Sequence, residues 1–155
     1  AKDGDYQNIK TINSVGTSSW TDGSVKTGKT YYYKIKTVVK TQNGEQTSGF
    51  SNVKSAKAVP AKTTLKAKAS DAKNVKLTWS KVKGASGYEI YRSNSKDGKC
   101  SKVKTISKGS TTSYKNGKLK KSTTYYYKIR AYRKVNGKKV YGSYSSVVSV
   151  KTKAK

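Results

Sequence analysis

The sequence lacks most of the side chains on which enzymatic sites depend. Histidine is absent, and the only cysteine is Cys100. One thiol cannot close an internal disulfide, and without histidine it cannot complete a zinc site. General acid-base and nucleophilic mechanisms want a histidine or two carboxylates within reach of each other, and only seven acidic residues are spread over the chain. We therefore predict no catalytic site, no metal site and no cofactor.

Long apolar stretches and an initiating methionine are also missing. No apolar run approaches the roughly 18 to 20 residues of a membrane-spanning helix, and no secretory signal is recognisable. The hydrophobic share is 32%, which is too low for a large enzyme-like core. Since the first residue is Ala1, we expect a mature or trimmed fragment of a longer protein.

What the sequence has in excess is lysine. It carries 35 basic and 7 acidic residues, a net charge of +28, and only Arg92, Arg130 and Arg133 are arginines. Sequence-specific DNA recognition relies on the rigid fork of arginine, whereas lysine behaves as a solvated point charge, so we predict no specific nucleic-acid binding. Two interpretations stay open. The lysines either protect strand edges from aggregation, or they bind polyanions such as wall polymers, anionic polysaccharide or, without sequence preference, nucleic acid.

The chain repeats itself at an offset of 94 residues. The segment DGDYQNIKTI at 3–12 aligns with DGKCSKVKTI at 97–106, and SWTDGSVKTGKTYYYKI at 19–35 aligns with SYKNGKLKKSTTYYYKI at 113–129. GFSNV at 49–53 then aligns with SYSSV at 143–147, whereas QNGEQ and VNGKK between them sit one position out of step. A period of this length is one small all-β domain, too long for a solenoid repeat.

The repeat divides the chain into an incomplete first copy and a complete second one. We predict residues 1–58 to be the C-terminal part of a first domain and residues 59–155 to be a whole second domain, with Pro60 at the boundary. Ala1 aligns with Ser95, so the first copy has no counterpart of residues 62–94. Because a half-domain exposes the inner faces of its strands, we expect the missing strands to come from upstream in the native chain or from another chain.

Alternating apolar residues in the second copy predict about seven short strands and no helix. The residues predicted to face inward are Val75, Leu77, Trp79, Tyr88, Ile90, Tyr125, Tyr127, Ile129 and Ala131. A single last strand over VYGSYSSVVSVKT is expected to follow a hairpin turn at Asn136-Gly137. An antiparallel β-sandwich is the natural closure for such strands.

These residues resemble the fibronectin type III domain, in the lysine-rich form found in surface and secreted proteins of Gram-positive bacteria. The resemblance is carried by Trp79 in LTW, by GYEIYRS at 87–93 and by LKKSTTYYYKIRAY at 119–132, and it covers nearly the whole chain. It implies an immunoglobulin-like antiparallel β-sandwich, present as one partial and one complete copy. It also implies a tyrosine corner, in which Tyr125 bonds the backbone near Leu119 and Tyr31 does the same near Val25.

Two smaller candidates are interpreted as structural. Asp3 and Asp5 in DGD suggest a calcium-binding turn, but the second copy has Lys99 in place of Asp5, which favours an ordinary turn. Cys100 aligns with Tyr6, so the repeat does not keep its chemistry constant. This difference favours a bystander thiol over a reactive one.

The remaining candidate is an outward face of tyrosines and cations. When Tyr125 and Tyr127 face inward, Tyr126 must face outward, and pairing with the YEIYR strand brings Glu89 and Tyr91 to the same face. The candidate binding face, for sugars or a neighbouring domain, consists of Tyr32, Tyr91, Tyr126, Lys128, Arg130 and Tyr132. The alternative, which we favour, is that tyrosines and lysine stems only cover the sheet by cross-strand packing.

The resemblance implies a modest function, because modules of this family are mostly spacers, stalks and binding platforms. We predict a non-catalytic structural module of an extracellular or cell-wall-associated bacterial protein. Its expected partners are neighbouring domains of the same or another chain, and anionic wall polymers or polysaccharide. The alternative is an ancillary carbohydrate- or polyanion-binding module of a larger secreted enzyme. Integrin recognition is not implied, because the last hairpin loop, KVNGKK at 134–139, lacks Arg-Gly-Asp.

Overall fold

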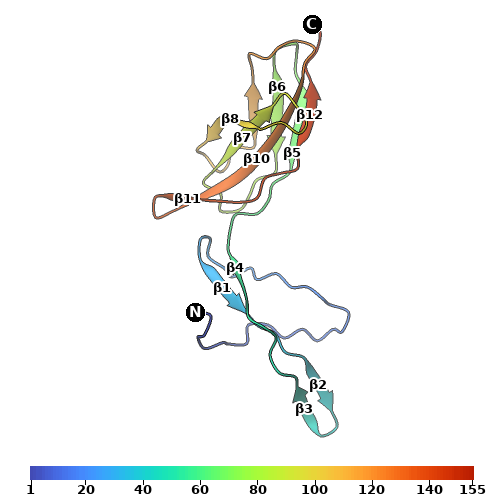
Figure 1. The fold of residues 1–155 in the computed structure, drawn as a ribbon, viewed down its shortest axis with the longest axis vertical. Coiled ribbons are helices and arrows are strands. Elements are labelled where there is room, and N and C mark those ends of the chain that lie inside the picture. The colour runs from blue at the N-terminus through green and yellow to red at the C-terminus, as the bar shows by residue number, and fades with distance from the viewer. The chain divides into compact units, whose positions relative to one another are not determined.

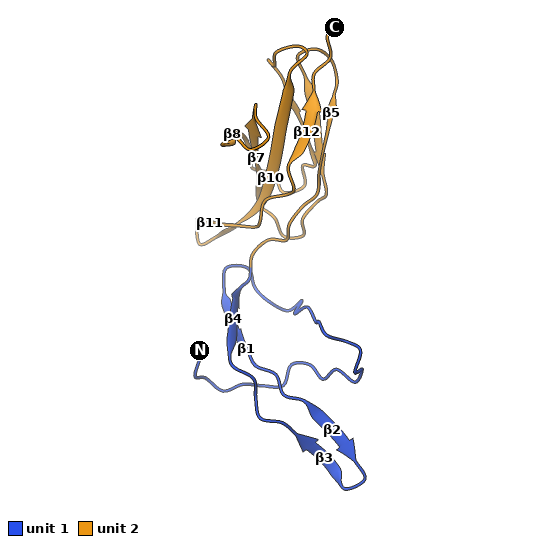
Figure 2. Ribbon diagram, turned by 45° about the vertical axis from the view of Figure 1, so that its right-hand side comes forward, with its two compact units in different colours: residues 1–58 blue, residues 59–155 orange.

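The computed structural model describes all 155 residues as twelve β-strands joined by turns and loops, with no helix (Figure 1). Every strand pairing is antiparallel. The prediction of an all-β antiparallel fold is therefore confirmed. The chain divides into two compact units, unit 1 from Ala1 to Ala58 and unit 2 from Val59 to Lys155 (Figure 2).

The larger sheet of unit 2 is built around its longest strand, β10 (Thr124–Val135). One side of β10 pairs with β7 (Gly87–Ser93), which in turn pairs with β8 (Ser101–Ile106). The other side pairs with β12 (Val148–Lys151) near the start of β10 and with β11 (Lys138–Tyr141) near its end. β10 therefore has hydrogen-bonded strands on both of its sides, and its inward-facing side chains pack in the core.

A three-stranded sheet, in the order β5-β6-β9, forms the second layer of unit 2. Its strands are β5 (Leu65–Ala69), β6 (Val75–Trp79) and β9 (Ser113–Asn116). One hydrophobic core joins the two sheets, and it contains every residue that alternation predicts to face inward: Val75, Leu77, Trp79, Tyr88, Ile90, Tyr125, Tyr127, Ile129 and Ala131. The prediction of the two inner faces is confirmed.

The end of unit 2 departs from the sequence prediction in one respect. Asn136 and Gly137 form the expected hairpin turn, with positive φ angles of 48° and 76°. The single last strand, however, is two strands, β11 and β12, with residues 142–147 between them. Gly142 lies against the backbone of Pro60, where a side chain has no room, and the Ser145 Oγ accepts a hydrogen bond of 3.1 Å from the Ile129 N–H. These local contacts replace regular pairing, so the strand is interrupted.

Unit 1 contains four short strands that pair two by two. β1 (Thr30–Tyr33) pairs with β4 (Lys54–Lys57), and β2 (Val38–Thr41) pairs with β3 (Gly44–Thr47). The segment before β1 runs without a strand in the structure (Figure 1).

The strand registers of unit 1 are those of unit 2 shifted by the sequence offset of 94. Tyr32 opposes Ser55 as Tyr126 opposes Ser149. The hairpin of β2 and β3 likewise has the register of the hairpin formed by the end of β10 and β11, although the Asn-Gly pairs in the two turns are one position out of step. The shift is absorbed within the turn. The assignment of residues 1–58 to part of a first domain stays a prediction.

A tyrosine corner is present in both units. The Tyr125 hydroxyl accepts a hydrogen bond of 2.9 Å from the Lys120 N–H, and the Tyr31 hydroxyl accepts one of 2.9 Å from the Lys26 N–H. Lys120 directly follows Leu119, and Lys26 directly follows the equivalent Val25. Both predicted corners are confirmed at the backbone positions that the sequence indicated.

Candidate functional site

The predicted binding face lies on the outer side of the larger sheet, where β7 and β10 pair. The register sets Lys128 opposite Tyr91 and Arg130 opposite Glu89, and all four side chains leave the sheet on the side away from the core. The structure thus places five of the six predicted residues on these two strands. Tyr32 is the sixth, and it lies on β1 of unit 1 with 37% of its surface exposed.

Tyr132 is buried, with only 1% of its surface exposed, and the prediction that it lies exposed on this face is wrong. It pairs with Gly87 on β7, where an added Cβ would come within 2.6 Å of the phenolic oxygen, and its hydroxyl donates to the Ile106 carbonyl of β8 at 3.3 Å. On β11, the Tyr141 ring lies 6.2 Å away and the Lys139 ammonium lies 4.5 Å from the Tyr132 ring centroid. The absent side chain of Gly87 lets the ring cross the neighbouring strand, and β11 covers it.

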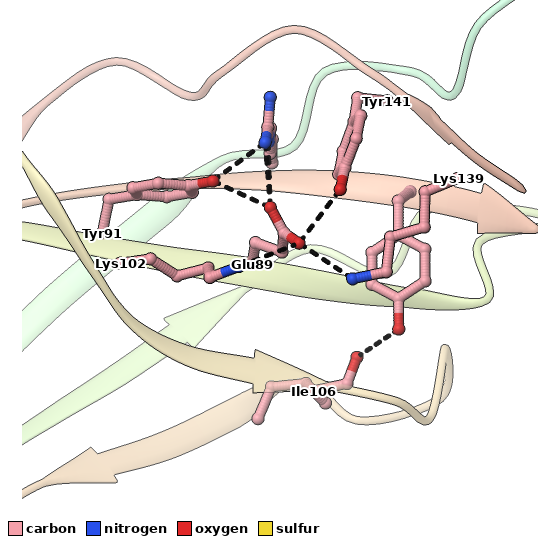
Figure 3. A network of polar contacts seen from close by, with 8 residues as sticks. Glu89, Tyr91, Lys102, Ile106, Lys139 and Tyr141 are labelled. Atoms are coloured by element: carbon pink, nitrogen blue, oxygen red, sulfur yellow. Dashed lines mark hydrogen bonds and ion pairs between the residues drawn. The ribbon is translucent and has the colours of Figure 1, made fainter.

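Glu89 is the centre of the outer face (Figure 3). Its side chain points away from the core, yet only 1% of it is exposed, because cations and tyrosines close over it. Arg130 donates to Oε2 from Nη2 at 2.9 Å and from Nε at 3.3 Å, and Lys139 donates to Oε1 at 2.9 Å. The Tyr91 and Tyr141 hydroxyls donate at 2.8 and 3.2 Å, and the Lys102 ammonium lies 3.7 Å from Oε1.

This arrangement keeps Glu89 ionised far into the acid range. Burial by itself raises the pKa of Glu89, but the hydrogen bonds from Lys139, Tyr91 and Arg130 outweigh burial and lower the pKa to about 2. The hydrogen bond to Glu89 also raises the pKa of Lys139, and burial raises the pKa of Tyr91. One carboxylate lies within ion-pair distance of three cations, so the net charge of the cluster is positive.

Tyr144 completes the cluster from the segment between β11 and β12. Its ring lies 5.2 Å from the Tyr91 ring in an edge-on contact, with the Arg130 guanidinium at 4.8 Å and the Lys128 ammonium at 4.5 Å from its centroid. Arg130 also lies 3.7 Å from the Tyr141 centroid. We define the Glu89 cluster as Glu89, Tyr91, Lys102, Lys128, Arg130, Lys139, Tyr141 and Tyr144.

Lys139, Tyr141 and Tyr144 were not predicted from the sequence to belong to this face. A signal for two of them was present, because an Asn-Gly hairpin turn fixes the register of the strands beside it. Counting outward from Asn136 and Gly137 sets Tyr141 opposite Tyr132, as the structure has it. The same count sets Lys139 opposite Lys134. Tyr144 has no comparable signal, because it lies in the irregular segment between β11 and β12.

Tyr126 remains outside the Glu89 cluster. It is half-buried, and its cross-strand neighbours are Ser93 on β7 and Ser149 on β12. Tyr32 has the equivalent neighbour, Ser55 on β4. Small neighbours leave the sides of a tyrosine ring uncovered, whereas the other tyrosines of the face are in contact with one another or with cations. A binding role for Tyr32 and Tyr126 stays a prediction.

A second surface of unit 2 presents cations that have no carboxylate partner. Lys68 on β5 opposes Lys76 on β6, which in turn opposes Lys115 on β9, and all three side chains are exposed. We call these three residues the lysine row. Asp71 lies in the turn between β5 and β6, and its pKa is lowered first by the Lys73 N–H and the Asn74 side chain and, more weakly, by Lys115. No ion pair joins Asp71 to the lysine row.

The remaining sequence candidates are the acidic pair Asp3 and Asp5 and the thiol of Cys100. No group of three or more histidine, cysteine, aspartate or glutamate side chains is placed to hold a metal ion, and this includes the surroundings of Asp3 and Asp5. Cys100 is a free thiol, partly buried, just before β8. The structure has no helix that is long and apolar enough to cross a membrane.

Comparison with solved structures places this geometry among fibronectin type III domains. The sixth such domain of human fibronectin type III domain containing protein 3 matches with a TM-score of 0.53 and 18% identity, over 64% of this chain and 92% of that one. The FN1–FN3 domains of chicken CNTN1 match with a TM-score of 0.53 and 22% identity, over 86% of this chain and 46% of that one. The fn3 domain of human contactin 1 matches with a TM-score of 0.51 and 18% identity, over 64% of this chain and 81% of that one.

These likenesses establish the fold, a fibronectin type III β-sandwich. The chain spans less than half the length of the chicken structure that it matches. No family model matches the sequence, and no curated protein matches it. A fibronectin type III fold is compatible with a structural or modular role, and it does not by itself assign a ligand.

Proposed function

We propose that the chain is a non-catalytic spacer module of an extracellular or cell-wall-associated protein of a Gram-positive bacterium, and that it contacts anionic wall polymers through lysine. The modular role is supported by the fold and by the filled core of unit 2. The polymer contact is supported by the balance of charges, because only three of the 35 basic side chains form ion pairs and all three pair with Glu89.

The lysine row is the observation that carries the polymer contact. Like charges directly opposite each other on neighbouring strands are destabilising, and the row contains two such oppositions in succession. Neighbouring strands lie about 4.8 Å apart, so the row presents three ammonium groups across about 10 Å. An anionic polymer that crosses the strands relieves this repulsion and releases its counterions. The Glu89 cluster offers no such gain, because its cations already contact a carboxylate and aromatic rings.

The test compares two triple variants of the same net charge. One replaces the lysine row, as Lys68→Gln, Lys76→Gln and Lys115→Gln. The other replaces three exposed lysines in the turns on either side of β8, as Lys96→Gln, Lys99→Gln and Lys108→Gln. Binding of fluorescent heparin and of fluorescent poly(glycerol phosphate) is measured by anisotropy over a range of salt concentrations, with neutral dextran as the uncharged control polymer.

We expect the unmodified chain to bind both anionic polymers at low salt. The lysine-row variant should lower the slope of log affinity against log salt by about 2 to 3, as expected for three lost contacts, and the turn variant should lower it by less than about 1. Absent binding at low salt, or equal effects of the two variants, would remove the polymer contact from the proposal. Binding to neutral dextran that survives high salt and depends on Tyr126 would favour the carbohydrate-binding alternative instead.

A further inference from the structure

Asparagine precedes glycine at three places in the chain, Asn43-Gly44, Asn116-Gly117 and Asn136-Gly137. In this dipeptide the glycine nitrogen can attack the asparagine side chain with little obstruction, because glycine has no side chain of its own. The last two pairs both lie in unit 2, and the structure gives them opposite surroundings. Comparing them separates what the fold contributes to reactivity from what the dipeptide contributes.

Asn136 and Gly137 form the turn between β10 and β11, at the tip of a hairpin that projects from the body of unit 2 (Figure 1). Both residues are exposed. Neither the Asn136 side chain nor the Gly137 N–H takes part in a hydrogen bond, and a Cβ built on Gly137 would meet nothing within 4 Å. The amide side chain and the nitrogen that could attack it are therefore both free to move.

Asn116 is held in place. Only 7% of its surface is exposed, and it ends β9. Its Oδ1 accepts hydrogen bonds from the Tyr127 hydroxyl at 2.8 Å and from Arg92 Nη1 at 3.3 Å. Gly117 is crowded as well, since a Cβ built on it would lie 2.8 Å from the Asn74 Oδ1. The Asn116 side chain cannot rotate towards the Gly117 nitrogen without losing these hydrogen bonds.

We propose that Asn136 is a site of spontaneous modification, at which asparagine is converted into aspartate and isoaspartate with water as the only co-reactant. The Gly137 nitrogen attacks the Asn136 Cγ and closes a cyclic imide, and the side-chain nitrogen leaves as ammonia with the proton of the Gly137 N–H. Water then opens the imide. Cleavage of the bond between the Gly137 nitrogen and Cγ gives aspartate, and cleavage of its bond to the main-chain carbonyl carbon gives isoaspartate.

Two features favour the reaction at this turn. Ring closure requires main-chain rotation at Asn136, and the exposed tip of a loop opens at little cost in free energy. The transition state carries negative charge because the attacking nitrogen loses its proton, and Lys134, Lys138 and Lys139 flank the turn. Cations close to a developing negative charge lower the barrier to its formation.

The isoaspartate product alters the hairpin, because the main chain then runs through the side-chain carbons of residue 136 and is one atom longer. The original turn, with φ angles of 48° and 76°, fixes the register of β10 and β11. The longer turn shifts Lys139 and Tyr141, which both donate hydrogen bonds to Glu89. Conversion to isoaspartate therefore weakens the Glu89 cluster. Aspartate keeps the original main chain and tolerates a positive φ, so it preserves the turn.

The test incubates the full chain at mildly alkaline pH, both folded and in urea, and follows deamidation by mass spectrometry. Cleavage after tyrosine gives peptides 115–125 and 133–141, so that each Asn-Gly pair of unit 2 is measured separately. Asn136→Gln is the matched control, because glutamine would have to close a larger ring. Chromatography isolates the isoaspartate form, and hydrogen exchange in residues 138–141 is compared between this form, the unmodified chain and Asn136→Asp.

In the folded chain Asn136 should convert at least about tenfold faster than Asn116, which reacts only after local opening, and in urea the two rates should be similar. Asn136→Gln should abolish conversion in peptide 133–141. The isoaspartate form should exchange residues 138–141 about tenfold faster than the unmodified chain and Asn136→Asp. The proposal is overturned if Asn136 converts no faster than Asn116 in the folded chain, or if urea leaves the ratio of the rates unchanged. Unaltered exchange in the isoaspartate form would overturn the link to the Glu89 cluster.

Discussion

Glu89 shows how a single residue organises a face on a chain with a net charge of +28. A buried carboxylate is costly unless charge and hydrogen bonds compensate it. Here two cations and two tyrosine hydroxyls donate hydrogen bonds to it, and a third cation lies nearby. The carboxylate therefore holds β7, β10 and β11 together and draws side chains that would otherwise repel one another into one cluster.

The depressed pKa of Glu89 predicts acid-sensitive stability. The folded pKa is about 2 and the reference value is 4.5, so the stabilisation is fully present above pH 4.5 and is lost as the pH falls towards 2. Glu89→Gln should lower the free energy of unfolding at neutral pH by about 2 kcal/mol, because the buried side chain at position 89 then no longer forms charged hydrogen bonds with Arg130 and Lys139. It should also flatten the pH dependence between these two values. Urea unfolding as a function of pH measures both effects.

The matched control for this experiment is Asp97→Asn, in the exposed turn before β8. It removes the same charge from unit 2 without touching the Glu89 cluster, so its stability and pH profile should follow those of the unmodified chain. If Glu89→Gln and Asp97→Asn give the same profile, Glu89 does not have the role assigned to it.

Among the strands, sequence alternation predicted the inner faces well and the outer face less well. Tyr125, Tyr127 and Ile129 are buried as expected, because a strand beside a filled core has only one apolar side. Tyr132 was misplaced because its burial depends on Gly87 of one neighbouring strand and on the covering strand β11, and alternation within β10 reports neither. The division of the last strand into β11 and β12 likewise depends on a contact with Pro60 far away in the sequence.

The lysine row predicts that unit 2 becomes more stable when the row is removed. Replacing Lys68, Lys76 and Lys115 by glutamine abolishes two oppositions of like charge, each of which destabilises the sheet by about 0.2 to 1 kcal/mol. Urea unfolding at low salt should therefore give a higher free energy of unfolding for this variant than for the turn variant of equal charge. The difference should shrink as salt is added, because salt screens exposed charges. If the row variant is less stable than the turn variant at low salt, repulsion between the three lysines does not destabilise the sheet.

Across the full chain, the two units contain closely matching hydrogen bonds that differ in their exposure to solvent. The Ile35 N–H donates to the Ser51 Oγ at 3.1 Å, and the Ile129 N–H donates to the Ser145 Oγ at 3.1 Å. Unit 2 covers its pair with a second sheet, and unit 1 leaves its pair in contact with solvent. Repetition in the sequence thus predicted the matching local geometry, while the burial of each unit depends on strands that only unit 2 contains.

Residue-resolved hydrogen exchange of the full chain tests the role of these covering strands, by comparing the amides of Ile35 and Ile129. Both amides donate over the same distance of 3.1 Å, so a difference in protection reports the cover provided by β5 and β6 and the pairing of β10 with β7. We predict that the Ile129 amide exchanges about a thousandfold or more slowly than the Ile35 amide, because opening it requires the core of unit 2 to unfold. Comparable protection of the two amides in the monomeric chain would contradict the assignment of unit 1 as an uncovered half of the fold.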